Sequence, residues 1–165
     1  SKKTQQENRY KHNAITNLQN KNYQKAIENF IKALEQDPTD IYCLKMLAYC
    51  YYVTGAYDSA IKRYNRVLKI KPDLADVYNN LGNVYYKINN FDEAIKAYEN
   101  AIKYSPENHN AYFNLANLYM HKEDYHKAIE YYKKALEIND KNAKACNNLG
   151  NAYYQIEEYD KAVEF

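Results

Sequence analysis

The sequence predicts an all-α solenoid built from helix-turn-helix repeats, because three features recur with the same period of 34 residues. A fixed period of this length is typical of stacked supersecondary units. The features are an alanine, an aromatic residue before it, and a second small residue further upstream. The alanines are Ala26, Ala60, Ala94, Ala128 and Ala162, the aromatic residues are Tyr23, Tyr57, Phe91, Tyr125 and Tyr159, and the upstream small residues are Ala14, Ala48, Gly82, Ala116 and Gly150.

The period organises residues 1–165 as a single domain of five repeats, expected at about 7–40, 41–74, 75–108, 109–142 and, shortened, 143–165. The last repeat would end inside its second helix, without the polar cap that a solenoid needs at a natural terminus. We therefore expect an excised piece of a longer chain. Uncovered apolar surface there predicts end-to-end self-association, domain exchange or fraying over residues 154–165.

The third repeat illustrates the expected pair of helices. Apolar residues at 77, 78, 81, 84, 85 and 88 follow the helical period, which predicts a first helix over residues 75–88. Asn89 and Asn90 favour a turn. A second helix is expected over residues 92–104, with Ala94, Tyr98 and Ala101 on its apolar face.

The second helices carry recognisable start and stop signals. Asp58, Asp92 and Asp160 lie in the first turn, where a carboxylate complements the positive end of the helix dipole. Prolines end the first three of these helices, and Asp140 in place of a fourth proline predicts a softer stop. The prolines are Pro38, Pro72 and Pro106. The small residues in both helices predict that the two helices of a repeat approach closely.

The repeats resemble the tetratricopeptide (TPR) pattern, with Tyr where that family often has Trp. The clearest match reads Tyr78-x2-Leu81-Gly82-x2-Tyr85…Ala94-x3-Tyr98…Pro106, and the other repeats follow in phase. The resemblance covers about residues 7–165. It implies a right-handed superhelix in which the first helix of each repeat (helix A) lines a concave groove. It also implies a protein-interaction module.

The A helices of the later repeats carry rows of asparagines on the face expected to line the groove. One row is Asn80, Asn114 and Asn148, and another is Asn83, Asn117 and Asn151, with Asn79, Tyr86, Lys87 and Lys144 beside them. A carboxamide offers one acceptor and two donors, so it can pair with both polar groups of a peptide unit. We therefore expect these rows to bind the backbone of an extended peptide. The alternative is a polar helix face that only contacts water.

The same face of the second repeat is apolar and aromatic, with Lys45 and Tyr49 included in the predicted site. Its other members are Tyr42, Met46, Tyr52 and Val53. Two interpretations remain open for this lining. It could dock an apolar side chain of the ligand, or it could cover a helix that precedes these residues in a longer chain.

Two known types of TPR groove can be compared with these residues. The segments Asn80-Leu81-Gly82-Asn83 and Asn148-Leu149-Gly150-Asn151 resemble the asparagine-ladder arrays, such as the superhelix of O-GlcNAc transferase, which hold extended substrate peptides. The two-carboxylate clamp of chaperone-binding TPR domains does not fit, because Asp76 would repel a carboxylate. The resemblance keeps two alternatives open, a substrate-docking arm of a larger enzyme such as a glycosyltransferase and a structural self-assembling module.

Composition argues against other functions. The net charge of +2 comes from interleaved acids and bases, which is not typical of a nucleic-acid surface. No apolar run is long enough to span a membrane. The four histidines do not cluster as metal ligands, and three glycines cannot form a phosphate-binding loop. We expect no cofactor and no catalytic residue within these residues.

Three cysteines, an odd number, do not form a disulfide framework, and we expect them to act as small buried hydrophobes. The residues are Cys43, Cys50 and Cys146. Free thiols predict a reducing compartment, the cytoplasm or the nucleus.

Overall fold

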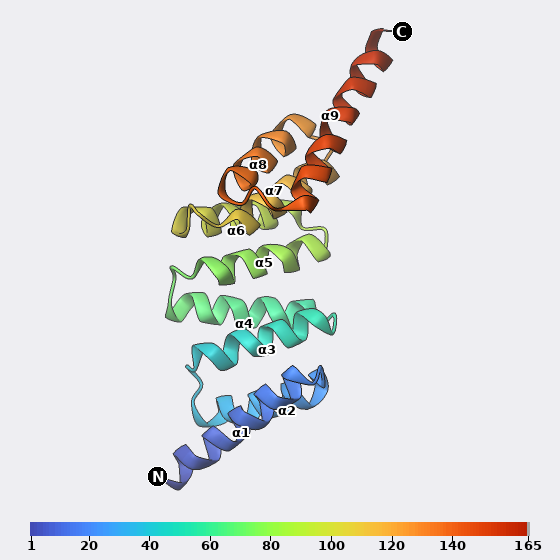
Figure 1. Cartoon of the computed structure of the whole chain (residues 1–165). Coiled ribbons are helices and arrows are strands. Elements are labelled where there is room, and N and C mark those ends of the chain that lie inside the picture. The colour runs from blue at the N-terminus through green and yellow to red at the C-terminus, as the bar shows by residue number, and fades with distance from the viewer. Residues whose placement is uncertain (165) are drawn as a thin grey trace.

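The computed structural model describes residues 1–164, which form nine α-helices arranged as a twisting stack (Figure 1). The helices are α1 (Lys2–Gln19), α2 (Tyr23–Gln36), α3 (Ile41–Val53), α4 (Tyr57–Ile70), α5 (Ala75–Lys87), α6 (Phe91–Tyr104), α7 (His109–His121), α8 (Tyr125–Ile138) and α9 (Ala143–Glu164). The odd-numbered helices are the A helices and the even-numbered ones are the B helices. This arrangement confirms the predicted all-α solenoid.

The A helices line the inner side of the array. Each B helix packs against the A helix before it and the A helix after it, and A helices of neighbouring repeats also touch, α3 with α5, α5 with α7 and α7 with α9. No two B helices within residues 1–164 contact one another to the same extent. Since the inner side of a curved array is the shorter one, contact between successive A helices places them on the concave face.

A single residue with positive φ ends each of the first four A helices. These residues stand 34 apart in the chain and are Lys21, Gly55, Asn89 and Glu123. In the third and fourth repeats a side-chain cap follows at once, because Asn90 and Asp124 accept hydrogen bonds from the backbone N–H groups of Glu93 and Lys127. Turn and cap together fix where the B helix begins.

The B helices end in the same register whether or not a proline follows. Helices α2, α4 and α6 each stop two residues before a proline, as predicted. Helix α8 stops at Ile138, in the same phase, although Asp140 replaces the proline. Helix α8 thus ends at the expected position, and the Asn139 side chain accepts a hydrogen bond from the N–H of Lys141 in the loop beyond the helix. That this stop is softer stays a prediction.

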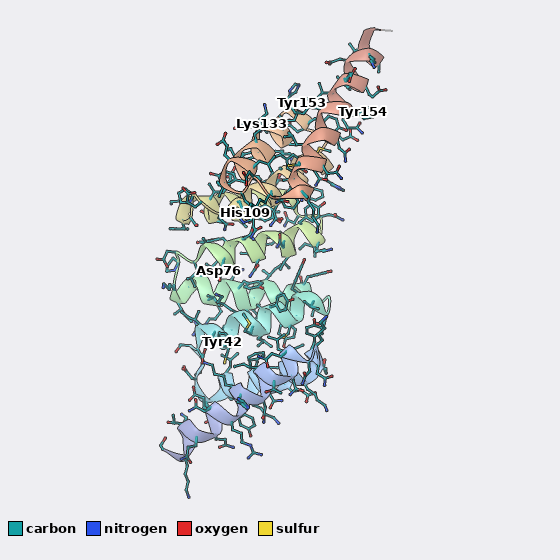
Figure 2. All side chains as sticks on the ribbon, in the orientation of Figure 1. Tyr42, Asp76, His109, Lys133, Tyr153 and Tyr154 are labelled. Carbon is teal, nitrogen blue, oxygen red and sulfur yellow. The ribbon has the colours of Figure 1, made fainter. Side chains whose placement is uncertain are left out.

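The fifth repeat differs from the prediction. Residues 143–164 form one continuous helix, and its distal part projects beyond the stack (Figure 1). Tyr153 and Tyr154 on this helix are exposed by 47% and 59% (Figure 2). Residue 165, the last residue of the predicted second helix, lies outside the described residues.

The absence of a turn in α9 has an energetic reason. Glu157 is equivalent to the four residues with positive φ, a backbone conformation that costs a non-glycine residue on the order of 1–3 kcal/mol. In repeats one to four a B helix of 14 residues offsets this cost by packing on the A helix. Residues 159–163 are exposed and do not pack on an A helix, so nothing within the described residues offsets the cost of a turn at Glu157.

The core of each of the first four repeats is an aromatic ring of the B helix packed against small residues. The rings belong to Phe30, Tyr64, Tyr98 and Tyr132, and all four are at most 2% exposed. The A-helix residues Ala14, Ala48 and Ala116 and the B-helix residues Ala26, Ala60, Ala94 and Ala128 are fully buried, as the close approach predicts. Gly150 and Ala162, which lie on α9, are exposed instead.

Gly82 shows how close this contact is. A Cβ atom at residue 82 would lie 2.5 Å from Cε1 of Tyr98, far inside van der Waals contact, whereas a Cβ at Gly150 would have no atom within 4 Å. We predict that Gly82→Ala lowers the free energy of unfolding. Overpacking costs about 1–3 kcal/mol, more than the roughly 1 kcal/mol that alanine gains over glycine as a helix former.

Gly150→Ala is the matched control, because it makes the same chemical change on an A helix without a clash. It should raise the free energy of unfolding or leave it unchanged. Urea titrations of both variants measure the two effects. If both substitutions stabilise the protein, the Tyr98 ring does not lie against residue 82.

Candidate functional site

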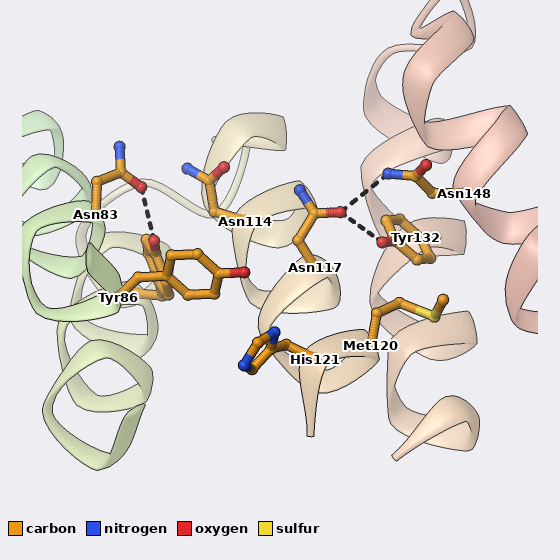
Figure 3. Close-up of a pocket in the computed structure, with 9 residues that line it drawn as sticks. Asn83, Tyr86, Asn114, Asn117, Met120, His121, Tyr132 and Asn148 are labelled. Atoms are coloured by element: carbon orange, nitrogen blue, oxygen red, sulfur yellow. Dashed lines mark hydrogen bonds between the residues drawn. The ribbon is translucent and has the colours of Figure 1, made fainter. Parts of the chain in front are cut away.

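A hollow of about 480 Å³ opens on the concave face between α5, α7 and α9 (Figure 3). Four asparagines line it, one from α5, two from α7 and one from α9. They are Asn83, Asn114, Asn117 and Asn148. Tyr86 also lines the hollow, where its ring lies near Phe91 and His121 at centroid distances of 5.7 and 5.9 Å.

The buried tyrosines of the B helices reach the hollow with their hydroxyl groups. The hydroxyl of Tyr98 donates a hydrogen bond to Oδ1 of Asn83 at 2.6 Å, and that of Tyr132 donates to Oδ1 of Asn117 at 2.5 Å (Figure 3). A buried hydroxyl without a partner is costly, so these asparagines satisfy a requirement of the core. Burial raises the pKa of Tyr132 to about 12 and raises that of Tyr98 as well.

Asparagines of neighbouring repeats also bond to each other. Nδ2 of Asn114 donates to Oδ1 of Asn79, and Nδ2 of Asn148 donates to Oδ1 of Asn117, both at 3.1 Å. The Asn117 oxygen therefore accepts two hydrogen bonds, which uses both of its lone pairs. The sequence-based expectation that every carboxamide offers a donor and an acceptor to a ligand is wrong for Asn117, which can only donate.

Ion pairs take the place of these amide contacts in the first repeats. Lys11 on α1 binds Asp40 at the start of α3 at 2.7 Å, and Lys45 on α3 binds Asp76 on α5. The predicted site residue Lys45 is thus neutralised by a carboxylate. Nearby, Tyr42, Tyr49 and Val53 of α3 are about 40% exposed and form an apolar part of the same face.

The structure brings together only part of the predicted site. The hollow contains five of the predicted residues, Asn83, Tyr86, Asn114, Asn117 and Asn148. Asn79 and Asn80 are half-buried on α5 outside it, and Asn151 is exposed on α9. Lys87 and Lys144 are also exposed and do not line the hollow.

The predicted site did not include Met120 and His121, which line the hollow from the end of α7, nor the two tyrosine hydroxyls. A spacing of 15 residues could have revealed the hydroxyl contacts. Asn83 and Asn117 each precede a core tyrosine by this spacing, whereas Ile15 precedes Phe30, which has no hydroxyl to satisfy. In repeat two the residue at this spacing before Tyr64 is Tyr49, so the pairing of a core tyrosine with an asparagine is confined to repeats three and four.

Residues 1–164 also contain two buried thiols and one cluster of three carboxylates, all outside the hollow. Burial raises the pKa of Cys43 to about 12 and that of Cys50 to about 11, so both thiols stay protonated and unreactive near neutral pH. Cys146 is exposed, so the expectation that all three cysteines are buried is wrong for this one. The carboxylates of Glu7, Asp37 and Asp40 lie close together, but Asp40 already binds Lys11 and the N–H of Cys43.

Models of the tetratricopeptide repeat match four stretches of the sequence. Three models described as "Tetratricopeptide repeat" match residues 14–40, 79–143 and 131–164, and one described as "TPR repeat" matches residues 48–89. The chain belongs to the tetratricopeptide repeat family. TPR arrays are scaffolds for protein–protein interaction, and this coarse function follows from the family. The asparagine-ladder type of groove remains a prediction.

Solved structures with the same fold are similar over nearly the whole chain. A crystal structure of MamA protein superposes with a TM-score of 0.85 at 25% identity, over 98% of this chain and 88% of that one. MamA from Desulfovibrio magneticus RS-1 gives 0.85 at 21% identity, over 96% and 90%. PilF of Pseudomonas aeruginosa gives a TM-score of 0.82 at 23% identity, over 99% of this chain and 75% of that one.

No curated protein sequence matches the chain. Within residues 1–164, no helix combines the length and the apolar character needed to cross a membrane.

The bond between Asn83 and Tyr98 predicts coupled stability effects. Asn83→Ala should lower the free energy of unfolding by about 1–3 kcal/mol, because the Tyr98 hydroxyl loses its acceptor. In a Tyr98→Phe background the same substitution should cost less than about 0.5 kcal/mol, since no hydroxyl remains to be satisfied. Urea titrations of the two single variants and the double variant measure this coupling. Additive effects would show that the two side chains do not depend on each other.

The raised tyrosine pKa values predict a loss of stability at alkaline pH. An unfolded tyrosine loses its proton near pH 10, whereas burial holds the proton on Tyr64, Tyr98 and Tyr132 to higher pH. The folded state then binds more protons, so the free energy of unfolding falls as the pH rises above about 10. Urea midpoints between about pH 9 and pH 12 should show this fall, and Tyr132→Phe should make it less steep. An equal slope in both proteins would contradict the role of Tyr132.

Proposed function

We propose that the concave face of repeats three to five binds an extended segment of a partner protein through the side-chain amide N–H groups of its asparagines. The observation that supports this proposal is that the side-chain oxygens of two asparagines already accept hydrogen bonds inside the protein. Asn83 and Asn117 give their oxygens to buried tyrosines, while no residue within 1–164 accepts a hydrogen bond from their Nδ2 groups. Water or a ligand must satisfy these donors.

A peptide carbonyl is a suitable acceptor for such a donor. Every residue of an extended peptide offers one, so the contact does not depend on the ligand's side chains. Each hydrogen bond contributes only about 0.5–1.5 kcal/mol net, so several must act together. The ligand should therefore run across α5, α7 and α9 and not insert at one point.

The apolar surface of α3 adds a second element to the proposed groove. Tyr42, Tyr49 and Val53 lie on the A helix that precedes the asparagines, so an apolar ligand side chain could pack there. Lys11 and Lys45 are held by carboxylates of the array and do not remain available to an acidic ligand. The recognition is thus expected to be largely uncharged.

The proposal predicts the behaviour of a variant that keeps the fold but loses the donors. In the double variant Asn83→Asp/Asn117→Asp, each carboxylate still accepts the tyrosine hydroxyl, but its N–H groups are gone. A peptide selected from a random display library on the wild-type protein should bind with a Kd on the order of micromolar, about −8 kcal/mol. The double variant should bind it at least about tenfold more weakly. Isothermal titration calorimetry measures both affinities.

The matched control is Asn29→Asp/Asn100→Asp, which makes the same change on the B helices α2 and α6. This control should bind the peptide as the wild type does, and raising the salt concentration should change the wild-type affinity little. Alanine substitutions in the part of the peptide that crosses α5, α7 and α9 should also have small effects, because its backbone makes the contacts there. Equal weakening in both double variants would attribute the loss to added charge and would refute the role of the amide donors.

A further inference from the structure

A second hollow, of about 590 Å³, lies on the B-helix side of the array between α2 and α4. It shares no residue with the concave hollow, so a ligand bound here would be independent of the proposed peptide groove. Its α2 side is mainly apolar, with Ile31 and Leu34 followed by Pro38, although the carboxylate of Glu35 also lines it. Leu44 and Leu47 of α3 contribute further apolar surface.

The other wall of this hollow is strongly basic. It consists of four cations of α4, Lys62, Arg63, Arg66 and Lys69. None of them forms an ion pair with a carboxylate within residues 1–164. Arg63 lies over the ring of Tyr51, with 5.6 Å between its guanidinium carbon and the ring centroid. Two of the three arginines of the chain belong to this wall.

Helix α4 differs from the neighbouring B helices in this respect. It carries four cations against the single carboxylate of Asp58, a net charge of +3. Helix α2 carries two lysines against two glutamates, and α6 carries two lysines against three acids. The basic wall is therefore a local feature of α4 and not a consequence of the repeat pattern.

We propose that the hollow between α2 and α4 binds an acidic amphipathic helix of a partner protein. The apolar stripe of such a helix would pack on Ile31, Leu34 and Pro38, and the acids beside the stripe would meet the cations of α4. The apolar contacts and the ion pairs would thus form along the same two turns of the partner helix. Complementary charge also accelerates association and excludes basic partners.

The spacing of the cations favours a helix over an extended strand. Lys62, Arg66 and Lys69 are separated by four and three residues, so they rise by about 6 and 4.5 Å along α4. Acids at the same intervals on a partner helix have the same rise. Alternate residues of an extended strand are about 6.6–6.8 Å apart. This spacing differs from the rises of about 6 and 4.5 Å between the cations, so the mismatch grows along the strand.

The test uses a fluorescein-labelled, helix-stapled peptide of about four turns, or about 14 residues. Its leucines stand at i, i+3, i+4 and i+7 and glutamates flank them. Fluorescence anisotropy should show binding to the wild-type protein that weakens as salt is added. Lys62→Glu/Lys69→Glu should weaken binding at least tenfold. Lys96→Glu/Lys103→Glu, the same change at the equivalent positions of α6, should alter it less than twofold.

Two further binding measurements separate the apolar contribution to the affinity from the charged one. Ile31→Asn, at a side chain exposed by 36%, should weaken binding several-fold while circular dichroism remains unchanged. A peptide of the same composition with its leucines scattered around the helix should bind at least tenfold more weakly. Equal binding of the scattered peptide, equal weakening by the two double variants, or no binding to the wild type would each overturn the proposal.

Discussion

The contact between an aromatic ring of the B helix and small residues of the A helix is the interaction on which the rest of the structure depends. It sets the distance between the two helices and recurs with the period of the chain. At Gly82 the ring of Tyr98 lies so close that no Cβ fits. The ring is tyrosine in repeats two, three and four. In repeats three and four its hydroxyl reaches an asparagine on the concave face.

This hydroxyl links stability to the groove. Asn83 and Asn117 accept its hydrogen bond, so the side chains that line the concave hollow also complete the core. Their oxygens are engaged by the fold, which leaves N–H donors for a ligand. The concave face is thus largely uncharged. The hollow is lined by carboxamides, and Lys11 and Lys45 in the first two repeats are paired with carboxylates. The surface of α4 on the other side is basic and offers a different kind of contact.

The sequence predicted the features that depend on the period and on local chemistry. Small residues at 14, 48, 82 and 116 and prolines after the B helices have the expected places, and four of the asparagines predicted on the A helices line the concave hollow. It did not predict the continuous α9, because a repeated pattern does not reveal whether packing offsets the cost of a turn at Glu157. Nor did it reveal which atom of Asn117 remains available, since that depends on Tyr132 and on Asn148 of the next repeat.

The measurement that most directly tests this account is proton exchange of the tyrosine hydroxyls and the asparagine side-chain amides by nuclear magnetic resonance. The hydroxyl protons of Tyr98 and Tyr132 should exchange slowly with solvent and keep their signals when a groove-binding peptide is added. The Nδ2 protons of Asn83 and Asn117 should exchange rapidly in the free protein and become protected in the complex. Rapidly exchanging hydroxyls, or amides that the peptide does not protect, would contradict the division of these carboxamides between core and ligand.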